Sequence, residues 1–295
     1  MILTRATRTR HPRALSRVPS PALVLGAVAS VQVGSALAKT LFDRAGPLGM
    51  VLLRLGVGAV VLLALTRPRL RGRSRRQLVL VVAFGAALAA MNSTFYSAID
   101  RIPIGVAVTV EFAGPLAVAV AGSRRLLDLV WVALAAVGVA LLTRGPAGTL
   151  DPVGLGLAGV AAACWAAYIL LSQGVGRAFR GADGLALATA VGFVLVAPVG
   201  LAQAGGALGD WRVLAAGAGV GLLSAAIPYS LEIEALRRLP ARVFGVLMSI
   251  EPAVGALAGL VVLGEALRSR EVAAIALVCV ASAGAAWADR RAPLD

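Results

Sequence analysis

Long apolar runs, separated by short polar connections, fill almost the whole chain. A window of about 19 residues, the length needed to cross the hydrocarbon of a bilayer, finds ten such runs. A backbone in hydrocarbon must satisfy its own hydrogen bonds, so each run is expected to be a helix. The predicted helices cover approximately residues 21–42, 47–66, 77–99, 103–122, 128–143, 153–174, 184–203, 212–233, 241–263 and 271–288. The pattern therefore predicts an all-α, polytopic membrane protein with ten transmembrane helices.

The arginines divide the connections into two sets. Both ends of the chain and every second connection carry 20 Arg residues in total, whereas the other connections carry six. Because short loops rich in Arg and Lys stay in the cytoplasm, this alternation supports ten helices and places both termini in the cytoplasm. We interpret the net charge of +14 as a topology signal rather than as a nucleic-acid-binding surface. A cleaved signal peptide is the alternative for the first run, but about 22 residues is long for its apolar region.

One pattern occurs twice, 137 residues apart, at 101–115 and 238–252. In each copy an Arg is followed two residues later by a Pro, and a second Pro follows twelve residues after the first. Each copy also places a glutamate, Glu111 or Glu251, inside an apolar stretch. With five runs per half, an odd number, the second half must enter the membrane from the opposite side. Two inverted repeats with Pro-interrupted, acid-containing segments are typical of a secondary transporter.

The repeat predicts how the chain is divided. We expect a basic cytoplasmic tail at 1–20, a first five-helix repeat at 21–143, an external connection at 144–152, a second repeat at 153–288 and a short cytoplasmic tail at 289–295. The connection is polar and rich in Gly and Pro, which is typical of a link between structural units.

Charged residues inside apolar runs are the main candidates for function. A charge near the middle of a membrane costs at least ~2.5–3.5 kcal/mol, and five residues qualify: Lys39, Arg54, Glu111, Glu232 and Glu251. Ionisation of a carboxylate is disfavoured in a low-dielectric medium, so Glu111 and Glu251 could exchange protons near neutral pH. Arg54 cannot release its proton, so it suits binding of a substrate carboxylate, or it is a permanent counter-ion for Glu111. For Lys39 we favour a side chain that reaches the interface, and for Glu232 an interfacial ion pair.

Polar and aromatic residues within the runs form a possible cavity lining. These candidates are Gln32, Asn92, Tyr96, Trp165, Tyr168, Ser172, Ser224 and Tyr229, with Lys39 and Glu232 at the ends of their helices. Pro115 and Pro252 are predicted helix breaks, because proline lacks the N–H that a helix interior needs. The alternative is that the aromatics are packing or belt residues. Trp165 and Tyr168 lie too deep for a belt, which favours the cavity.

Several stretches resemble a known family. They are Ser30–Lys39, Leu53–Gly56, Met91–Tyr96, Val110–Val118, Cys164–Leu170, Ile227–Glu232 and Met248–Pro252. Over residues 20–288 the chain resembles the EamA branch of the drug/metabolite transporter superfamily, and within it the threonine/homoserine exporters of bacterial inner membranes. The resemblance implies ten spans and export of small neutral hydroxy amino acids driven by a proton gradient. The arginine-rich N-terminal tail departs from the family pattern.

Other chemistries lack the residues they need. The sequence has no P-loop and no Cys/His cluster, and its single histidine, His11, lies in the N-terminal tail. We therefore expect no enzyme, no metal and no cofactor other than a proton gradient. The expected partners are an amino-acid substrate and lipid, with no nucleic acid, and the oligomeric state stays open. Two alternatives remain: a drug or metabolite exporter of the same fold, whose glutamates would bind a lipophilic cation, and a non-transporting membrane protein.

Overall fold

The computed structural model describes residues 18–69, 72–121, 126–143, 150–179, 181–236, 238–239 and 241–288. These residues form helices and no strand. The helices are α1 (Ser20–Lys39), α2 (Phe42–Thr66), α3 (Arg75–Ile99), α4 (Ile104–Glu111), α5 (Ala113–Ala121), α6 (Leu126–Thr143), α7 (Pro152–Ala178), α8 (Asp183–Ala204), α9 (Trp211–Gly221), α10 (Ile227–Leu236), α11 (Ala241–Met248), α12 (Glu251–Ala258) and α13 (Ser269–Ala288). The all-α prediction is confirmed, and each predicted apolar run coincides with a helix or with consecutive helices.

Six helical segments of the described chain are long and apolar enough to cross a membrane. They are Ser20–Lys39, Phe42–Thr66, Arg75–Ile99, Pro152–Ala178, Asp183–Gly209 and Val243–Leu263. Shorter apolar helices cover Ile104–Val118, Val130–Leu142 and Trp211–Ala226. Many large apolar side chains on these helices face outward, among them Val60, Leu65 and Val261, which are at least 70% exposed. Such an outer surface suits lipid rather than water, so the protein is a multi-pass membrane protein.

Local signals explain where several helices begin. Pro21 and Pro152 stand in the first turns of α1 and α7, where a missing N–H costs nothing. The Asp151 carboxylate accepts the Val153 N–H as the N-cap of α7 and also accepts a hydrogen bond from Arg101 at 2.9 Å. The Arg101 bond, with the Val153 bond, holds the pKa of Asp151 below its ordinary value. Ser74 and Gln77 form a capping box at the start of α3.

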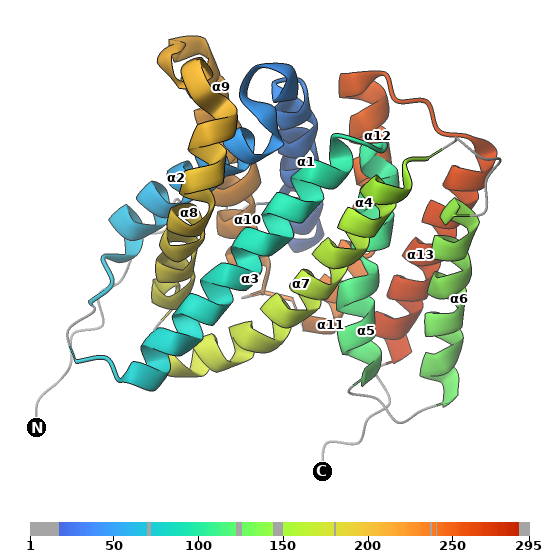
Figure 1. Cartoon of the computed structure of the whole chain (residues 1–295). Helices are drawn as coiled ribbons and strands as arrows, with labels where there is room; N and C mark the ends of the chain where they lie inside the picture. Colours follow the sequence, from blue (N-terminus) through green and yellow to red (C-terminus); the bar gives the residue numbers. More distant parts are fainter. Residues whose placement is uncertain are drawn as a thin grey trace, which may run out of the picture.

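The two halves of the chain interleave in space (Figure 1). Helices α2, α8 and α9 lie on one side of the bundle and α6 and α13 on the other, while α3 and α7 cross the front. Helix α1 packs against α10 and α12, and α4 packs against α12 and α7. Because each half contributes helices to both sides, a space in the middle of the bundle is bounded by both halves.

Four interruptions lie in helices that border this space. A turn at Phe112 separates α4 from α5, and a turn at Ser249 and Ile250 separates α11 from α12. The other two are π-helical turns, Leu222–Ala226 between α9 and α10 and Gly259–Leu263 after α12. Irregular backbone at membrane depth is tolerated where it faces protein or a cavity.

Candidate functional site

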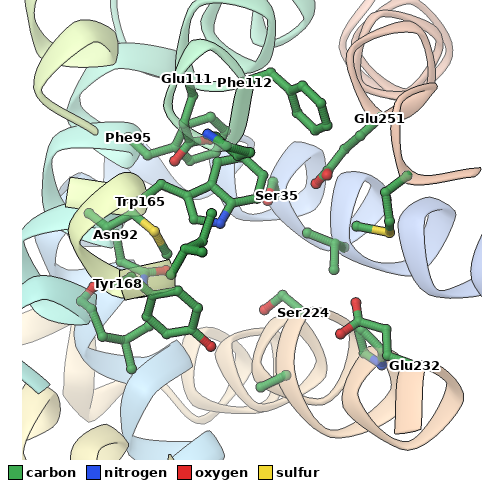
Figure 2. Close-up of a pocket in the computed structure, with 18 of the residues that line it drawn as sticks. Ser35, Asn92, Phe95, Glu111, Phe112, Trp165, Tyr168, Ser224, Glu232 and Glu251 are labelled. Atoms are coloured by element: carbon green, nitrogen blue, oxygen red, sulfur yellow. Dashed lines mark hydrogen bonds between the residues drawn. The ribbon is translucent and has the colours of Figure 1, made fainter. Parts of the chain in front are cut away.

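A cavity of about 540 Å³ lies between helices of both halves. Its size falls in the range of small-molecule sites, roughly 300–1,000 Å³. Its polar lining consists of Gln32, Ser35, Arg54, Asn92, Glu111, Tyr168, Thr189, Ser224, Glu232, Glu251 and Ser282, beside the aromatics Phe95, Phe112, Trp165 and Phe244. Figure 2 shows acids entering from three directions, with Glu111 at the top, Glu251 at the right and Glu232 at the lower right.

Arg54, on α2, is the cation among the described lining residues, and it contacts a side chain and a backbone carbonyl. Its Nη1 donates to the Tyr96 hydroxyl at 3.2 Å, and its Nη2 donates to the Ser224 carbonyl at 3.4 Å. Pro228 lies four residues after Ser224 and has no N–H to donate, so that carbonyl needs another donor. The guanidinium also stands over the Tyr96 ring, 5.4 Å from its centroid. Arg54 is therefore fixed by groups other than acids, and no salt bridge joins it to Glu111 within the described chain.

Glu111 and Glu251 occupy different environments although both are buried, at 8% and 7% exposure. Glu251 is the first residue of α12, where the helix dipole favours a negative charge, and its Oε1 accepts a hydrogen bond from Gln32 Nε2 at 3.1 Å. Glu111 is the last residue of α4, followed by the Phe112 turn and Pro115. No hydrogen bond to its carboxyl group occurs among the described residues. The two carboxyl groups therefore differ in hydrogen bonding and in their position relative to the helix ends.

Glu232 and Lys39 lie differently from what the sequence favoured. Glu232, on α10, lines the cavity, and the neighbouring acid Glu234 is the one that pairs with Arg238. Lys39 lies outside the cavity wall at the end of α1. Its Nζ donates to Glu265 Oε1 at 2.6 Å and to the Ile102 carbonyl at 3.2 Å. Lys39 is therefore paired with Glu265, an acid distant in sequence, whereas the sequence favoured a side chain that extends to the membrane interface.

The predicted lining residues separate into two groups. Gln32, Asn92, Trp165, Tyr168 and Ser224 lie in the wall together with Arg54 and the three acids, and so does Pro115, which was predicted as a helix break. Tyr96 is fully buried and in contact with Arg54, and Ser172 bonds to the Ile169 carbonyl. Pro252, predicted as a helix break, is the second residue of α12, directly after the turn at Ser249 and Ile250, and does not line the cavity. The side chain of Tyr229 lies outside the described residues.

Sequence reasoning missed several wall residues. Ser35 follows Gln32 by three residues on α1, so helical spacing alone could have placed the two on one face. Phe112 packs edge to face on Trp165, with ring centroids 5.5 Å apart, and directly follows Glu111. Thr189 and Ser282 are hydroxyl residues within apolar stretches of α8 and α13, and no sequence signal distinguishes them from other small polar residues.

The fold and the cavity together define a class: a helical membrane protein with a buried polar site for a small solute. Comparison with known proteins identifies the family. The model of the EamA-like transporter family matches residues 152–287. The threonine/homoserine exporter RhtA of Salmonella typhimurium (strain LT2) is 43% identical over 276 residues, covering 92% of each chain. RhtA of Escherichia coli (strain K12) is 43% identical over 274 residues. The chain belongs to the EamA-like transporter family.

A solved crystal structure supports the fold independently. It is 22% identical in sequence and superposes with a TM-score of 0.61, covering 92% of this chain and 98% of its own. At this identity the likeness speaks for the fold alone. The resemblance stated from the sequence motifs is confirmed, and the relatives are exporters rather than enzymes, as expected.

Proposed function

We propose that this protein exports small neutral amino acids of the threonine and homoserine type across the cytoplasmic membrane, by proton antiport with alternating access. The observation that carries the proposal is the 43% identity to relatives named threonine/homoserine exporters, which extends over 92% of both chains. The cavity has the size and the charges that such a substrate requires.

A neutral amino acid presents a carboxylate and an ammonium group to its binding site. Arg54 supplies a fixed guanidinium suited to a carboxylate. Glu111, Glu232 and Glu251 supply acceptors for an ammonium group. Because these three acids outnumber the single guanidinium in a buried site, at least one acid is expected to hold a proton. A site that exchanges that proton for substrate would couple export to a proton gradient.

The packing supports the proposal of two inverted five-helix repeats with ten spans, at 21–143 and 153–288, joined by 144–152. Three contacts join a helix to its expected counterpart: α2 with α8, α4 with α12 and α6 with α13. Two further contacts are equivalent in the two repeats: α3 packs on α7, and their expected counterparts, α10 and α1, also pack on each other. A pseudo-twofold arrangement would produce this pattern, and rocking of the halves would open the cavity alternately to each side. The Arg distribution favours cytoplasmic tails at 1–20 and 289–295.

Growth of an exporter-deficient bacterium tests the proposed substrate. Cells that express the chain are expected to grow at inhibitory concentrations of homoserine or threonine at which empty-vector cells stop, because export lowers the internal concentration. Membrane blots confirm that the protein is present. If such cells were as sensitive as empty-vector cells while containing the protein in the membrane, amino-acid export would be rejected.

A second candidate is export of a lipophilic cation. The aromatic rings of Phe95, Phe112, Trp165 and Tyr168 beside buried acids favour it, because such rings and carboxylates both attract cations. Arg54 disfavours it by repulsion. A resistance profile against cationic drugs, with unchanged amino-acid tolerance, would select this candidate over the first.

Arg54→Gln is expected to weaken homoserine binding by roughly 10- to 100-fold, the loss typical of one hydrogen bond to a charged group. The Gln side chain can still reach Tyr96, but it cannot form a charged fork with a carboxylate. The measurement is the dissociation constant of homoserine for purified protein. Equal affinity of the variant and the wild type would show that Arg54 is only a structural cation.

A further inference from the structure

Four residues of the cavity wall have a buried side-chain oxygen with no hydrogen-bond partner among the described residues; one is Ser282, on α13, and the other three oxygens belong to the neighbouring helices α1 and α12. These three oxygens are Gln32 Oε1, Ser35 Oγ and Glu251 Oε2, and no hydrogen bond to them occurs among the described residues. Their residues are 2%, 1% and 7% exposed, and all three line the cavity. Buried polar atoms without partners are costly and rare in native proteins. Three of them on two adjacent helices of the cavity wall indicate a group that is supplied from outside the chain.

The local structure explains why these atoms lie together. Gln32 and Ser35 are one turn apart on α1, and Glu251 begins α12, which packs against α1. The bond from Gln32 Nε2 to Glu251 Oε1, 3.1 Å long, fixes the orientation of the amide and leaves its oxygen without a donor. Figure 2 shows the Glu251 carboxylate extending toward Ser35.

A glycine on α12 makes room for this arrangement. Gly255 lies one turn after Glu251, and a Cβ built there would approach Gln32 Oε1 to 3.1 Å. That distance is tighter than most contacts to a Cβ, so a side chain at 255 would displace the amide. The position of the Gln32 oxygen therefore depends on the hydrogen bond from Gln32 to Glu251 and on the absence of a side chain at Gly255.

We propose that Gln32, Ser35 and Glu251 form the subsite for the ammonium group of the exported amino acid, with Arg54 binding its carboxylate. The assignment rests on the proposed function and goes beyond it by giving each end of the substrate its own residues. A primary ammonium has three N–H donors and no acceptor. The subsite offers three acceptors, one of them a carboxylate oxygen, so number and charge both match.

The surroundings of the three acids suggest a different role for each. Glu251 accepts a fixed hydrogen bond and stands at a helix N-terminus, and both features suit a carboxylate that binds a cation. Glu111 receives no hydrogen bond in the described structure and ends a helix, so it is left for the proton. Glu232 lies on α10, apart from Ser35 in Figure 2.

The assignment is tested with a complete substrate and with two analogues that each lack one of its charged ends. They are homoserine, 4-hydroxybutanoate, which lacks the amino group, and 3-aminopropan-1-ol, which lacks the carboxylate. Their dissociation constants are measured with purified wild-type protein, with Gln32→Leu, which removes the amide at similar size, and with Arg54→Gln. Thr109→Val is the matched control, because Thr109 is fully buried outside the cavity wall and its hydroxyl bonds within α4.

Gln32→Leu is expected to weaken homoserine and 3-aminopropan-1-ol by about 10- to 100-fold and to leave 4-hydroxybutanoate within about twofold. Arg54→Gln should instead weaken 4-hydroxybutanoate and leave 3-aminopropan-1-ol within about twofold. Thr109→Val should bind all three ligands like the wild type. If Gln32→Leu weakened all three ligands alike while melting like the wild type, the subsite would be rejected and the proposed function would stand. Ser35→Ala replaces Gln32→Leu, with the same expected pattern, should the latter not fold. Wild-type protein that bound neither homoserine nor threonine would overturn the proposed function and this assignment with it.

Discussion

Glu111→Gln is expected to abolish accumulation of homoserine driven by a proton gradient in everted membrane vesicles, while exchange of labelled for unlabelled homoserine continues near the wild-type rate. Glutamine has almost the same shape as glutamate but cannot bind and release a proton in this way. Exchange of substrate for substrate needs only a binding site that opens alternately to both sides. A carrier that lost its proton site would therefore keep exchange and lose coupling.

Glu251→Gln provides the contrast within the same experiment. Because Glu251 is assigned to the ammonium group, its neutralisation should reduce both accumulation and exchange, with unchanged protein levels. Glu111→Gln vesicles that still accumulated homoserine in response to an acid interior would remove Glu111 from the proton pathway. Loss of both activities in both variants would assign the two acids a shared role in substrate binding.

Gly114→Ala is expected to destabilise the protein by about 1–3 kcal/mol or more, the usual range for overpacking. A Cβ at Gly114 would overlap the Ala162 carbonyl, because α5 and α7 approach each other backbone to backbone there. Backbone atoms cannot rotate away as a flexible side chain would, so the helices must separate. Gly114 also lies between Glu111 and Pro115, and the shift would reach the cavity wall.

Gly159→Ala is the matched control, on α7 itself. A Cβ at Gly159 meets nothing within 4 Å, and alanine usually stabilises a helix by roughly 0.5–1 kcal/mol relative to glycine. Thermal unfolding in one detergent compares the two variants with the wild type. Equal melting temperatures for Gly114→Ala and Gly159→Ala would mean that α5 and α7 do not pack as closely as the structure has them.

The helices were predictable because hydrocarbon imposes one simple requirement on the chain. Any run long and apolar enough must be helical, so hydropathy located the ten runs that contain α1 to α13 without knowledge of packing. The helix breaks were predictable only in part. Pro115 signals the one near Glu111, but the π-helical turn at Leu222–Ala226 depends on distant donors, since Ser30 and Arg54 bond to the carbonyls of Leu223 and Ser224.

The charged candidates could be recognised because an unexplained charge in an apolar run is costly wherever its partner lies. Their partners were not predictable. Lys39 bonds to Glu265, 226 residues away, and Gln32 bonds to Glu251, 219 residues away. Hydropathy carries no information about such pairs, so the sequence could not separate Lys39 from the cavity, whereas the helical spacing from Gln32 would have sufficed to add Ser35 to it.

Uptake of radiolabelled homoserine into proteoliposomes that contain only this protein tests the central claim most directly. With an acid interior and a neutral exterior, the proposed antiport predicts accumulation above the external concentration, which collapses when a protonophore is added. Protein-free liposomes should show none. Equilibration without accumulation would contradict proton coupling, and uptake equal to that of protein-free liposomes would contradict amino-acid transport itself.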